Sequence, residues 1–387
     1  MKRLGILTFH RPINYGAFLQ SYSLSNKIAA VIPDASVEII DYIAPRERKN
    51  IYLNVLSKLK RTGIKSAYEE VKKIQIFKRS LKYLKLSNKY ITSSALDELF
   101  DYIDSTYDAL IIGSDAVFNW KQNGFPSAFI PNYSFHIPVV TYAASVHGLK
   151  YYDESSDRIN ICREAFSKMP LIGVRDLCTE QFVSFCCKDA KIIHCCDPTF
   201  LLDFDVLYQI EHRSIDALFS EHNISSTKRY IVTMLQDQEV AKDVYNKYHS
   251  SYTVVALFSY TKYSDIFIGN ASPIEWSLLL RDASLVFTNF FHGTLLSLIQ
   301  GTPAMVVDTS HYFDKYEGKL MDLMIRRLGI SDLYTKIEDY LIDNSNFYLT
   351  ADSCLKGKYN SIILQAVERE RESFSNWKAL FQNIIQC

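Results

Sequence analysis

The sequence lacks the short motifs by which many enzyme classes are recognised. No G-x-G-x-x-G, G-x-x-x-x-G-K-[ST], H-E-x-x-H or G-x-S-x-G pattern occurs in its 387 residues. Such patterns place backbone amides, metal ligands or a nucleophile where the corresponding chemistry needs them. Nicotinamide redox chemistry, P-loop ATP hydrolysis, zinc proteolysis and α/β-hydrolase chemistry therefore have no support from a motif.

Excess charge and metal-site spacings are missing as well. The chain has 43 basic and 43 acidic residues, so its net charge gives no sign of a nucleic-acid partner. Its eight cysteines form no C-x-x-C pair, and the adjacent pairs Cys186-Cys187 and Cys195-Cys196 have no zinc-site spacing. We expect buried reduced thiols, no metal and no bound cofactor.

No long apolar run is present near the first residue. The stretch Leu4-Gly5-Ile6-Leu7 is much shorter than the core of a signal peptide or a membrane span. A cytoplasmic protein is the simplest interpretation.

Short β-branched apolar runs alternate with amphipathic stretches along the whole chain. This alternation is typical of parallel sheets covered by helices on both faces. A length of 387 residues exceeds one ordinary core. We therefore predict an α/β fold of two doubly wound, Rossmann-like domains facing a cleft. Ligands bind such sheets at the carboxyl ends of the strands.

The expected elements divide into two series, residues 1–205 and 206–387, with the boundary placed in 203–213. A helix over 361–385 is expected to pack back on the first domain. The expected strands are 4–9, 37–42, 109–112, 139–142, 171–174, 192–194, 230–234, 253–258, 285–288 and 304–307. The expected helices are 17–29, part of 53–86, 96–105, 157–168, 176–187, 239–249, 273–282, 293–300 and 315–328.

Residues 46–89 are strongly basic, with 14 Lys or Arg against three Glu. The apolar residues in this segment recur near the helical period, which predicts one or two amphipathic helices inserted into the first domain. Such a segment is either a solvated surface or a surface that binds anionic lipid or an anionic glycan. The second interpretation predicts peripheral contact with the inner face of the membrane.

Polar residues follow several predicted strands at the edge where a ligand is expected. The candidate binding or catalytic residues are Asn14, Tyr15, Gly16, Ser114, Asp115, Arg175, Asn289, His292, Gly293 and Thr294.

Each of the main candidates has two interpretations. His292 precedes a predicted helix, whose N-terminus suits a phosphate or carboxylate, and an imidazole there can donate a proton; it could equally cap the helix or lie in the core. Arg175 could clamp an anion or pair with Asp176 or another acid. Asp115 could take a proton from a hydroxyl or cap a helix. Asn14 could bind a ligand or cap a helix while Tyr15 packs, and Gly16 would permit a tight turn.

Six blocks of the sequence resemble the polysaccharide pyruvyl transferase family. They are "ILTFHRPINYGAFLQSYSL", "YDALIIGSDAVFNW", "VVTYAASVHG", "IGVRD", "CDPTFLL" and "ASLVFTNFFHGTLLSLIQGTPAMVV", and they extend from about residue 4 to residue 308. The resemblance implies a two-domain architecture similar to the GT-B glycosyltransferases. It also implies transfer of the pyruvyl group of phosphoenolpyruvate to two hydroxyls of a sugar, which gives a cyclic ketal and phosphate.

Family motif positions correspond to His292 as the catalytic histidine and Arg175 as an anion clamp, and the chemistry suits Asp115 as general base. The acceptor would be a cell-surface polysaccharide or a lipid-linked glycan precursor. Two positions depart from the family pattern: Ala116 and Phe118 stand where Gln and Trp are common, and Phe290 stands where Arg or Ser is usual. These departures keep two alternatives open, a glycosyltransferase that uses a nucleotide sugar and a non-catalytic glycan-binding protein.

Overall fold

The computed structural model describes residues 1–62, 64–93, 95–210, 214–221, 229–310 and 318–386. The chain forms two compact units. The first contains Met1–Ala67, Lys78–Leu202 and Arg371–Cys387, and the second contains Tyr68–Phe77 and Asp203–Glu370. Among the described residues, no helix is both long and apolar enough to cross a membrane.

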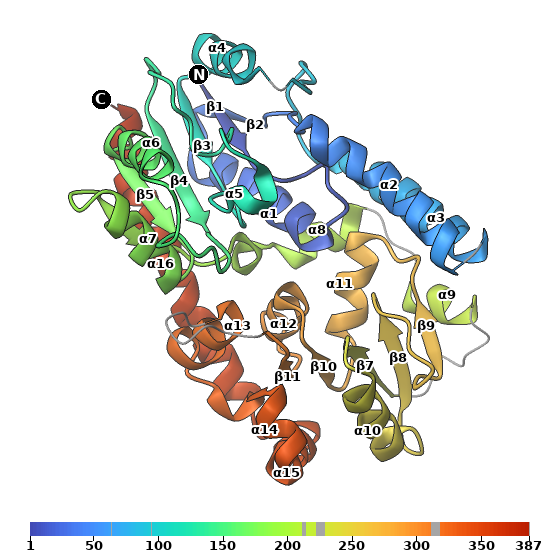
Figure 1. The fold of residues 1–387 in the computed structure, drawn as a ribbon. Coiled ribbons are helices and arrows are strands. Elements are labelled where there is room, and N and C mark those ends of the chain that lie inside the picture. Colours follow the sequence, from blue (N-terminus) through green and yellow to red (C-terminus); the bar gives the residue numbers. More distant parts are fainter. Residues whose placement is uncertain (63, 94, 211–213, 222–228, 311–317, 387) are drawn as a thin grey trace. The chain divides into compact units, whose positions relative to one another are not determined.

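The first unit is built on a six-stranded parallel sheet in the order β2-β1-β3-β4-β5-β6 (Figure 1). Its central strands are buried along their whole length, as expected when helices cover both faces. The strands are β1 (Lys2–Leu7), β2 (Ala35–Ile39), β3 (Ala109–Ile112), β4 (Val139–Ala144), β5 (Leu171–Val174) and β6 (Ile192–His194).

The second unit repeats this plan with a different strand order. Its six parallel strands lie in the order β12-β11-β10-β7-β8-β9. The strands are β7 (Tyr230–Met234), β8 (Thr253–Leu257), β9 (Ile266–Ile268), β10 (Val286–Thr288), β11 (Ala304–Asp308) and β12 (Tyr334–Lys336). The predicted α/β class with two doubly wound domains is therefore confirmed.

Many helices begin at a side chain that accepts a backbone N–H, which is the usual N-cap arrangement. Asp176 caps α7, Asp237 caps α10, and Ser272 with Glu275 forms a capping box at α11. The helices are α1 (Tyr15–Val31), α2 (Pro45–Thr62), α3 (Ile64–Ser80), α4 (Leu96–Thr106), α5 (Trp120–Asn123), α6 (Ser156–Ser167), α7 (Leu177–Cys186), α8 (Phe204–Ile210), α9 (Ile215–Ser220), α10 (Gln238–Tyr248), α11 (Pro273–Arg281), α12 (Phe291–Leu298), α13 (Lys319–Met321), α14 (Ile337–Ile342), α15 (Ser345–Leu355) and α16 (Asn360–Gln386).

Several sequence expectations need correction. The short strands β9 and β12 were not expected, nor were the helices α5, α8, α9, α14 and α15. Helix α12 begins at Phe291 rather than at Gly293. The helix expected over 315–328 starts within the described residues at α13 and continues as a π-helical turn over Asp322–Arg327, while residues 315–317 lie outside the described part.

The basic insertion is divided between the two units. The sequence assigned all of 46–89 to the first domain, whereas Tyr68–Phe77 of α3 groups with the second unit. Within that stretch Ile74 and Phe77 are buried, and the Lys73 ammonium lies 5.4 Å from the centroid of the Phe258 ring. The contact with Phe258 links this part of α3 to the second unit.

Helix α16 also contributes to both units, and the change occurs between Glu370 and Arg371. Its second half covers the first sheet, where Figure 1 shows it in red along β4 and β5. The buried Trp377 donates its indole N–H to the Thr141 carbonyl at 2.9 Å and packs edge-on against Tyr142. The first sheet thus obtains part of its covering layer from a segment far along the chain.

Candidate functional site

The candidate residues of the first unit lie where the strand order of its sheet reverses. The helix after β1 crosses to β2, while the later strands continue from β3 on the other side of β1. Ligands of open α/β sheets bind at such a reversal, beyond the carboxyl ends of the strands. Asn14 follows β1 and Asp115 follows β3 at this edge, and Arg175 and Asp197 follow β5 and β6.

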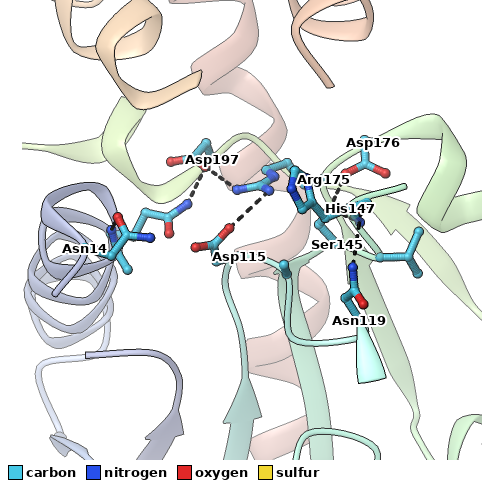
Figure 2. Close-up of polar contacts among 12 residues, drawn as sticks. Asn14, Asp115, Asn119, Ser145, His147, Arg175, Asp176 and Asp197 are labelled. Carbon is cyan, nitrogen blue, oxygen red and sulfur yellow. Dashed lines mark hydrogen bonds and ion pairs between the residues drawn. The ribbon is translucent and has the colours of Figure 1, made fainter. Parts of the chain in front are cut away.

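Arg175 is the centre of a buried ion-pair network in this unit (Figure 2). Its Nη1 donates to Asp197 Oδ2 at 2.9 Å and its Nη2 donates to Asp115 Oδ1 at 3.4 Å. Gln20 of α1 donates its amide N–H to the same Asp197 oxygen. Asp197 Oδ1 accepts from the backbone N–H of Thr199 at 3.0 Å and from its hydroxyl at 2.8 Å, so Asp197 is held on every side.

The two ion pairs differ in burial and strength. The Asp197 side chain is 1% exposed and the Asp115 side chain is 16% exposed. Burial by itself lowers the pKa of the Arg175 guanidinium, but the carboxylates of Asp115, Asp197 and Asp176 outweigh burial and raise it. Arg175 therefore stays charged, with its short, enclosed contact to Asp197 and its long, more accessible contact to Asp115.

The helix-cap interpretation of Asp115 is wrong, because no helix starts there. Helix α5 begins at Trp120, and the Asn119 side chain caps it by accepting from the amides of Lys121 and Gln122. Asp115 instead has a left-handed backbone with φ of 77°, which is unusual for a residue with a side chain. Its carbonyl accepts from the Ser145 N–H at 2.9 Å, and this bond fixes the loop so that the carboxylate meets Arg175.

Asp176, the residue next to Arg175, has a structural role. Its Oδ2 accepts from the Ser145 hydroxyl at 2.6 Å, and its Oδ1 accepts from the Thr179 amide at 2.9 Å. The Asn119 amide donates to the His147 carbonyl at 3.3 Å in the same region (Figure 2). Asp176 thus caps α7 and bonds the loop after β4, while Arg175 bonds Asp115 and Asp197.

The predicted loop of Asn14, Tyr15 and Gly16 forms the start of α1. Asn14 is exposed and accepts the Ala17 N–H at 3.1 Å, so it caps the helix as one interpretation proposed. Tyr15 is buried and is the first helical residue. Gly16 lies in the first turn of α1, so the change of chain direction occurs before it and the tight-turn role expected for Gly16 is wrong.

Ser114 lies inside the unit. The residue is 1% exposed, and its hydroxyl has no hydrogen-bond partner among the described residues. The preceding Gly113 has φ of 122°, and a Cβ there would lie 2.2 Å from the Tyr142 carbonyl oxygen. Only glycine fits at this position, so β3 can end in this loop only with Gly113.

A separate charged cluster lies near the carboxyl ends of β1 and β2. His10 is fully buried, with its Nδ1 3.2 Å from the Thr8 carbonyl oxygen and its Nε2 3.1 Å from Asp41 Oδ1. Arg11 donates from both Nε and Nη2 to the Asp41 carboxylate. Burial raises the pKa of Asp41, but the hydrogen bonds from His10 and Arg11 more than offset it, so the pKa lies below its ordinary value.

His292 lies at the strand-order reversal of the second sheet. Strands β7, β8 and β9 extend to one side and β10, β11 and β12 to the other, so the reversal is between β7 and β10. Helix α12 follows β10, and His292 is in its first turn and is half-buried. The helix starts two residues earlier than expected because the Phe290 carbonyl accepts both the N–H and the hydroxyl of Thr294.

The neighbouring candidates of the second unit have clear structural partners. The Asn289 amide donates to Thr309 Oγ1 at 3.0 Å and to Gln236 Oε1 at 3.4 Å, and Asn289 is partly exposed. Thr294 is fully buried. A Cβ at Gly293 would lie 2.8 Å from Met234 Cε, so the glycine lets α12 approach β7 closely.

Phe290 joins an aromatic group instead of supplying a charge. Its ring lies 5.9 Å from that of Phe258, which in turn packs edge-on against Trp276. Among the described residues, no side chain caps the N-terminus of α12. A cation is present nearby, because the Lys319 ammonium lies 5.4 Å from the centroid of the Phe291 ring.

Three residues that lie near Arg175 or near α12 were not predicted from the sequence. They are Asp197, Gln20 and Lys319. Asp197 had a signal, since an aspartate before a proline commonly starts a turn, and it lies in the quoted block "CDPTFLL". Gln20 and Lys319 had none, because only the folded chain brings α1 to Asp197 and α13 to α12.

The fold is similar to that of sugar-nucleotide enzymes. A UDP-GlcNAc 2-epimerase from Neisseria meningitidis, solved with UDP-GlcNAc, superposes with a TM-score of 0.55 at 9% identity and covers 97% of this chain and 100% of its own. A putative UDP-N-acetylglucosamine 2-epimerase from Listeria monocytogenes gives a TM-score of 0.53 at 11% identity, covering 98% of this chain and 95% of its own. At these identities the similarity shows the fold alone, a two-domain α/β fold of the GT-B type.

Sequence comparison gives the family. No curated protein matches the sequence significantly. The family model for polysaccharide pyruvyl transferase matches residues 14–311, which contain Asp115, Arg175, Asp197 and His292. The chain therefore belongs to the polysaccharide pyruvyl transferase family.

Proposed function

We propose that the protein transfers the pyruvyl group of phosphoenolpyruvate to two hydroxyls of a cell-surface polysaccharide or a lipid-linked glycan precursor, forming a pyruvate ketal. The observation that carries this proposal is the position of His292, in the first turn of α12 at the strand-order reversal of its sheet. An imidazole at a helix N-terminus combines a proton donor with a backbone that attracts a phosphate or a carboxylate.

The reaction needs one acid and one base. His292 donates a proton to the methylene carbon of phosphoenolpyruvate, which becomes a methyl group and leaves C2 electrophilic. A sugar hydroxyl attacks C2, phosphate leaves, and the second hydroxyl closes the ketal. The two hydroxyls lose one proton each. One of these protons replaces the proton that His292 gave to carbon, and the other is carried away by phosphate. No metal or cofactor takes part in this scheme.

Arg175 and Asp115 supply the anion contact and the base. The Arg175–Asp115 contact is long, at 3.4 Å, and lies on the more exposed side of the network. A substrate carboxylate or phosphate can replace Asp115 on Nη2 while Asp197 keeps the guanidinium in place. A carboxylate that loses a cationic partner becomes a stronger base. Anion binding thus activates Asp115 to take the hydroxyl proton.

The other candidates contribute binding contacts in this scheme. Asn14 and Asn289 offer polar groups near the two reversals. Thr294 is buried and holds the start of α12, while Tyr15, Gly16, Ser114 and Gly293 shape the backbone. Phe290 supplies no charge, and Lys319 supplies a cation beside α12. We place the protein in the cytoplasm, at the inner face of the membrane when its acceptor is lipid-linked.

A direct assay tests the proposal. Purified protein is incubated with phosphoenolpyruvate and a panel of pyruvate-free glycans, and phosphate release is measured together with the ketal methyl signal by NMR. The His292→Gln variant is expected to lose about 10²- to 10⁴-fold in rate, the range for a lost general acid. His249→Gln is the matched control, because His249 is an exposed histidine at the end of α10 in the same unit.

Three results would contradict the proposal. Equal rates for wild type and His292→Gln would exclude His292 as the acid. Absence of turnover with every acceptor, together with thermal stabilisation by a nucleoside diphosphate but not by phosphoenolpyruvate, would favour a glycosyltransferase. Binding of glycan with neither effect would favour a non-catalytic glycan-binding protein.

A further inference from the structure

Helix α2 exposes apolar side chains to solvent along one face. Leu53 and Leu56 are 45% and 53% exposed, although leucines are usually buried. Lys49 and Lys60 are exposed too, and with the leucines they follow the spacing i, i+4, i+7, i+11 that defines one face of a helix. This face therefore has two leucines at its centre and a lysine at each end.

The opposite side of α2 is turned inward. Ile51 and Val55 lie on that side and are only partly exposed. Glu47, the acidic residue of the first turn, is also partly buried, and burial raises the pKa of its carboxyl to about 7. Among the described side chains of α2, the exposed face therefore contains no acidic residue.

Helix α3 also exposes apolar side chains. Ile64, Tyr68 and Val71 lie at i, i+4 and i+7 and are all exposed, Ile64 by 81% and Tyr68 by 57%. Further along α3, Ile74 and Phe77 are buried. The apolar side chains that these helices expose are thus additional to those that hold the helices to the protein.

The charge of this region differs from that of the rest of the chain. Residues 46–89 contain 14 Lys or Arg against three Glu, while the whole chain is neutral, so the remainder is acidic by the same amount. Lysines beside exposed leucines are the pattern of a helix that lies in a membrane interface, where apolar groups enter the acyl boundary and cations meet anionic headgroups.

We propose that the exposed face of α2 binds the surface of a membrane that contains anionic phospholipid. The partner follows from the charge: each lysine near an anionic surface strengthens attachment, and the leucines add burial of apolar area. This proposal goes beyond the proposed reaction and does not depend on it, because attachment can be measured without turnover.

A second cluster of exposed apolar side chains has acidic neighbours instead of basic ones, and it provides a control. Leu341, Ile342 and Leu349 of α14 and α15 are all exposed, but acidic residues accompany them, including Glu338 and Asp339. Acidic neighbours are repelled by an anionic membrane. Exposed leucine alone therefore does not explain attachment; leucine with lysine does.

The experiment is co-sedimentation of the full chain with vesicles of phosphatidylcholine, with and without phosphatidylglycerol, at low and high salt. Wild type is expected to bind only the phosphatidylglycerol vesicles and to be released by salt. Lys49→Gln with Lys60→Gln should weaken binding about 25-fold, at about fivefold for each lysine. Leu53→Gln with Leu56→Gln should also weaken it, whereas Leu341→Gln with Leu349→Gln should bind like wild type.

Several outcomes would overturn the proposal. These are equal binding to neutral vesicles, salt-insensitive binding, and double variants of α2 that bind as wild type does. Retention on a soluble anionic polysaccharide without sedimentation on vesicles would assign the surface to a glycan instead. Circular dichroism confirms that each variant is folded, and unchanged ketal formation on a water-soluble acceptor separates loss of attachment from loss of activity.

Discussion

At the scale of single residues, Arg175 depends on Asp197 more than on Asp115. The Asp197 contact is shorter and almost fully enclosed, and Gln20 and Thr199 hold the carboxylate from other directions. A buried cation is tolerated only when such a partner remains. Asp197 therefore positions Arg175, and in the proposed reaction Asp115 is the member of the network that takes the proton.

Replacing the two aspartates separately tests this division. Asp197→Asn leaves Arg175 short of a buried partner and should lower the free energy of unfolding by about 3 kcal/mol. Its KM for phosphoenolpyruvate should rise, since the guanidinium is no longer fixed. Asp115→Asn should lower kcat with a much smaller change in stability. Chemical denaturation and steady-state kinetics distinguish the two, and the same stability loss in both variants would contradict the division.

Asp41 predicts a pH dependence of stability. Its pKa in the folded protein lies below the ordinary value of 3.8, although burial opposes this, because His10 and Arg11 bind the ionised form. The stabilisation is therefore complete above the unfolded pKa and is lost as the pH falls through the lower, folded value. Asp41→Asn should cost about 2 kcal/mol at neutral pH and progressively less in acid. Urea unfolding over this range measures it, and a pH-independent difference would disprove the linkage.

Residue roles were only partly predictable from the sequence. Asp115 followed a strand and was compatible with both a cap and a base, and local preference favoured the cap. The outcome depended on the left-handed backbone at Asp115 and on α5 starting later, at Trp120. The backbone of Asp115 is held by a long-range bond from the Ser145 N–H to the Asp115 carbonyl, which no local pattern contains.

At the scale of elements, the loop after β3 depends on one glycine. Gly113→Ala would place a Cβ 2.2 Å from the Tyr142 carbonyl oxygen, in a backbone region that side chains avoid. We expect the loop to shift, with a loss of stability of roughly 3 kcal/mol or more and a large loss of activity through displaced Asp115. Gly124→Ala is the control, since it also has a positive φ but has no atom within 4 Å of the added Cβ.

Element type was predictable where burial is strong and not where strands are short. Strands β3, β4 and β5 consist of residues that are all buried, and their apolar runs stand out. Strand β12 is only Tyr334-Thr335-Lys336, half-exposed at the sheet edge, and has no such run. The start of α12 was misplaced because Phe290 is not a common cap, so the helix start depends on Thr294 instead.

At the scale of the whole molecule, the first unit is completed by the second half of α16. Trp377 is buried, is bonded to Thr141 and contacts the rings of Tyr142 and Phe381. Trp377→Ala should cost about 3–5 kcal/mol, and it should destabilise the first unit, although Trp377 lies after the second unit in the sequence. Hydrogen exchange resolves the effect by segment; loss of protection in β7 and β10 rather than in β4 and β5 would contradict it.

This chain order has a consequence for synthesis on the ribosome. The strands of the first sheet emerge early, but Ser373 and Trp377, which bond Cys196 and Thr141, emerge only after residues 203–370 have been made. At about 5–20 residues per second this delay is on the order of 10 s. During that interval the part of the first sheet that α16 covers is left without that helix. The unit whose strands come earlier in the chain is therefore the one that is completed later.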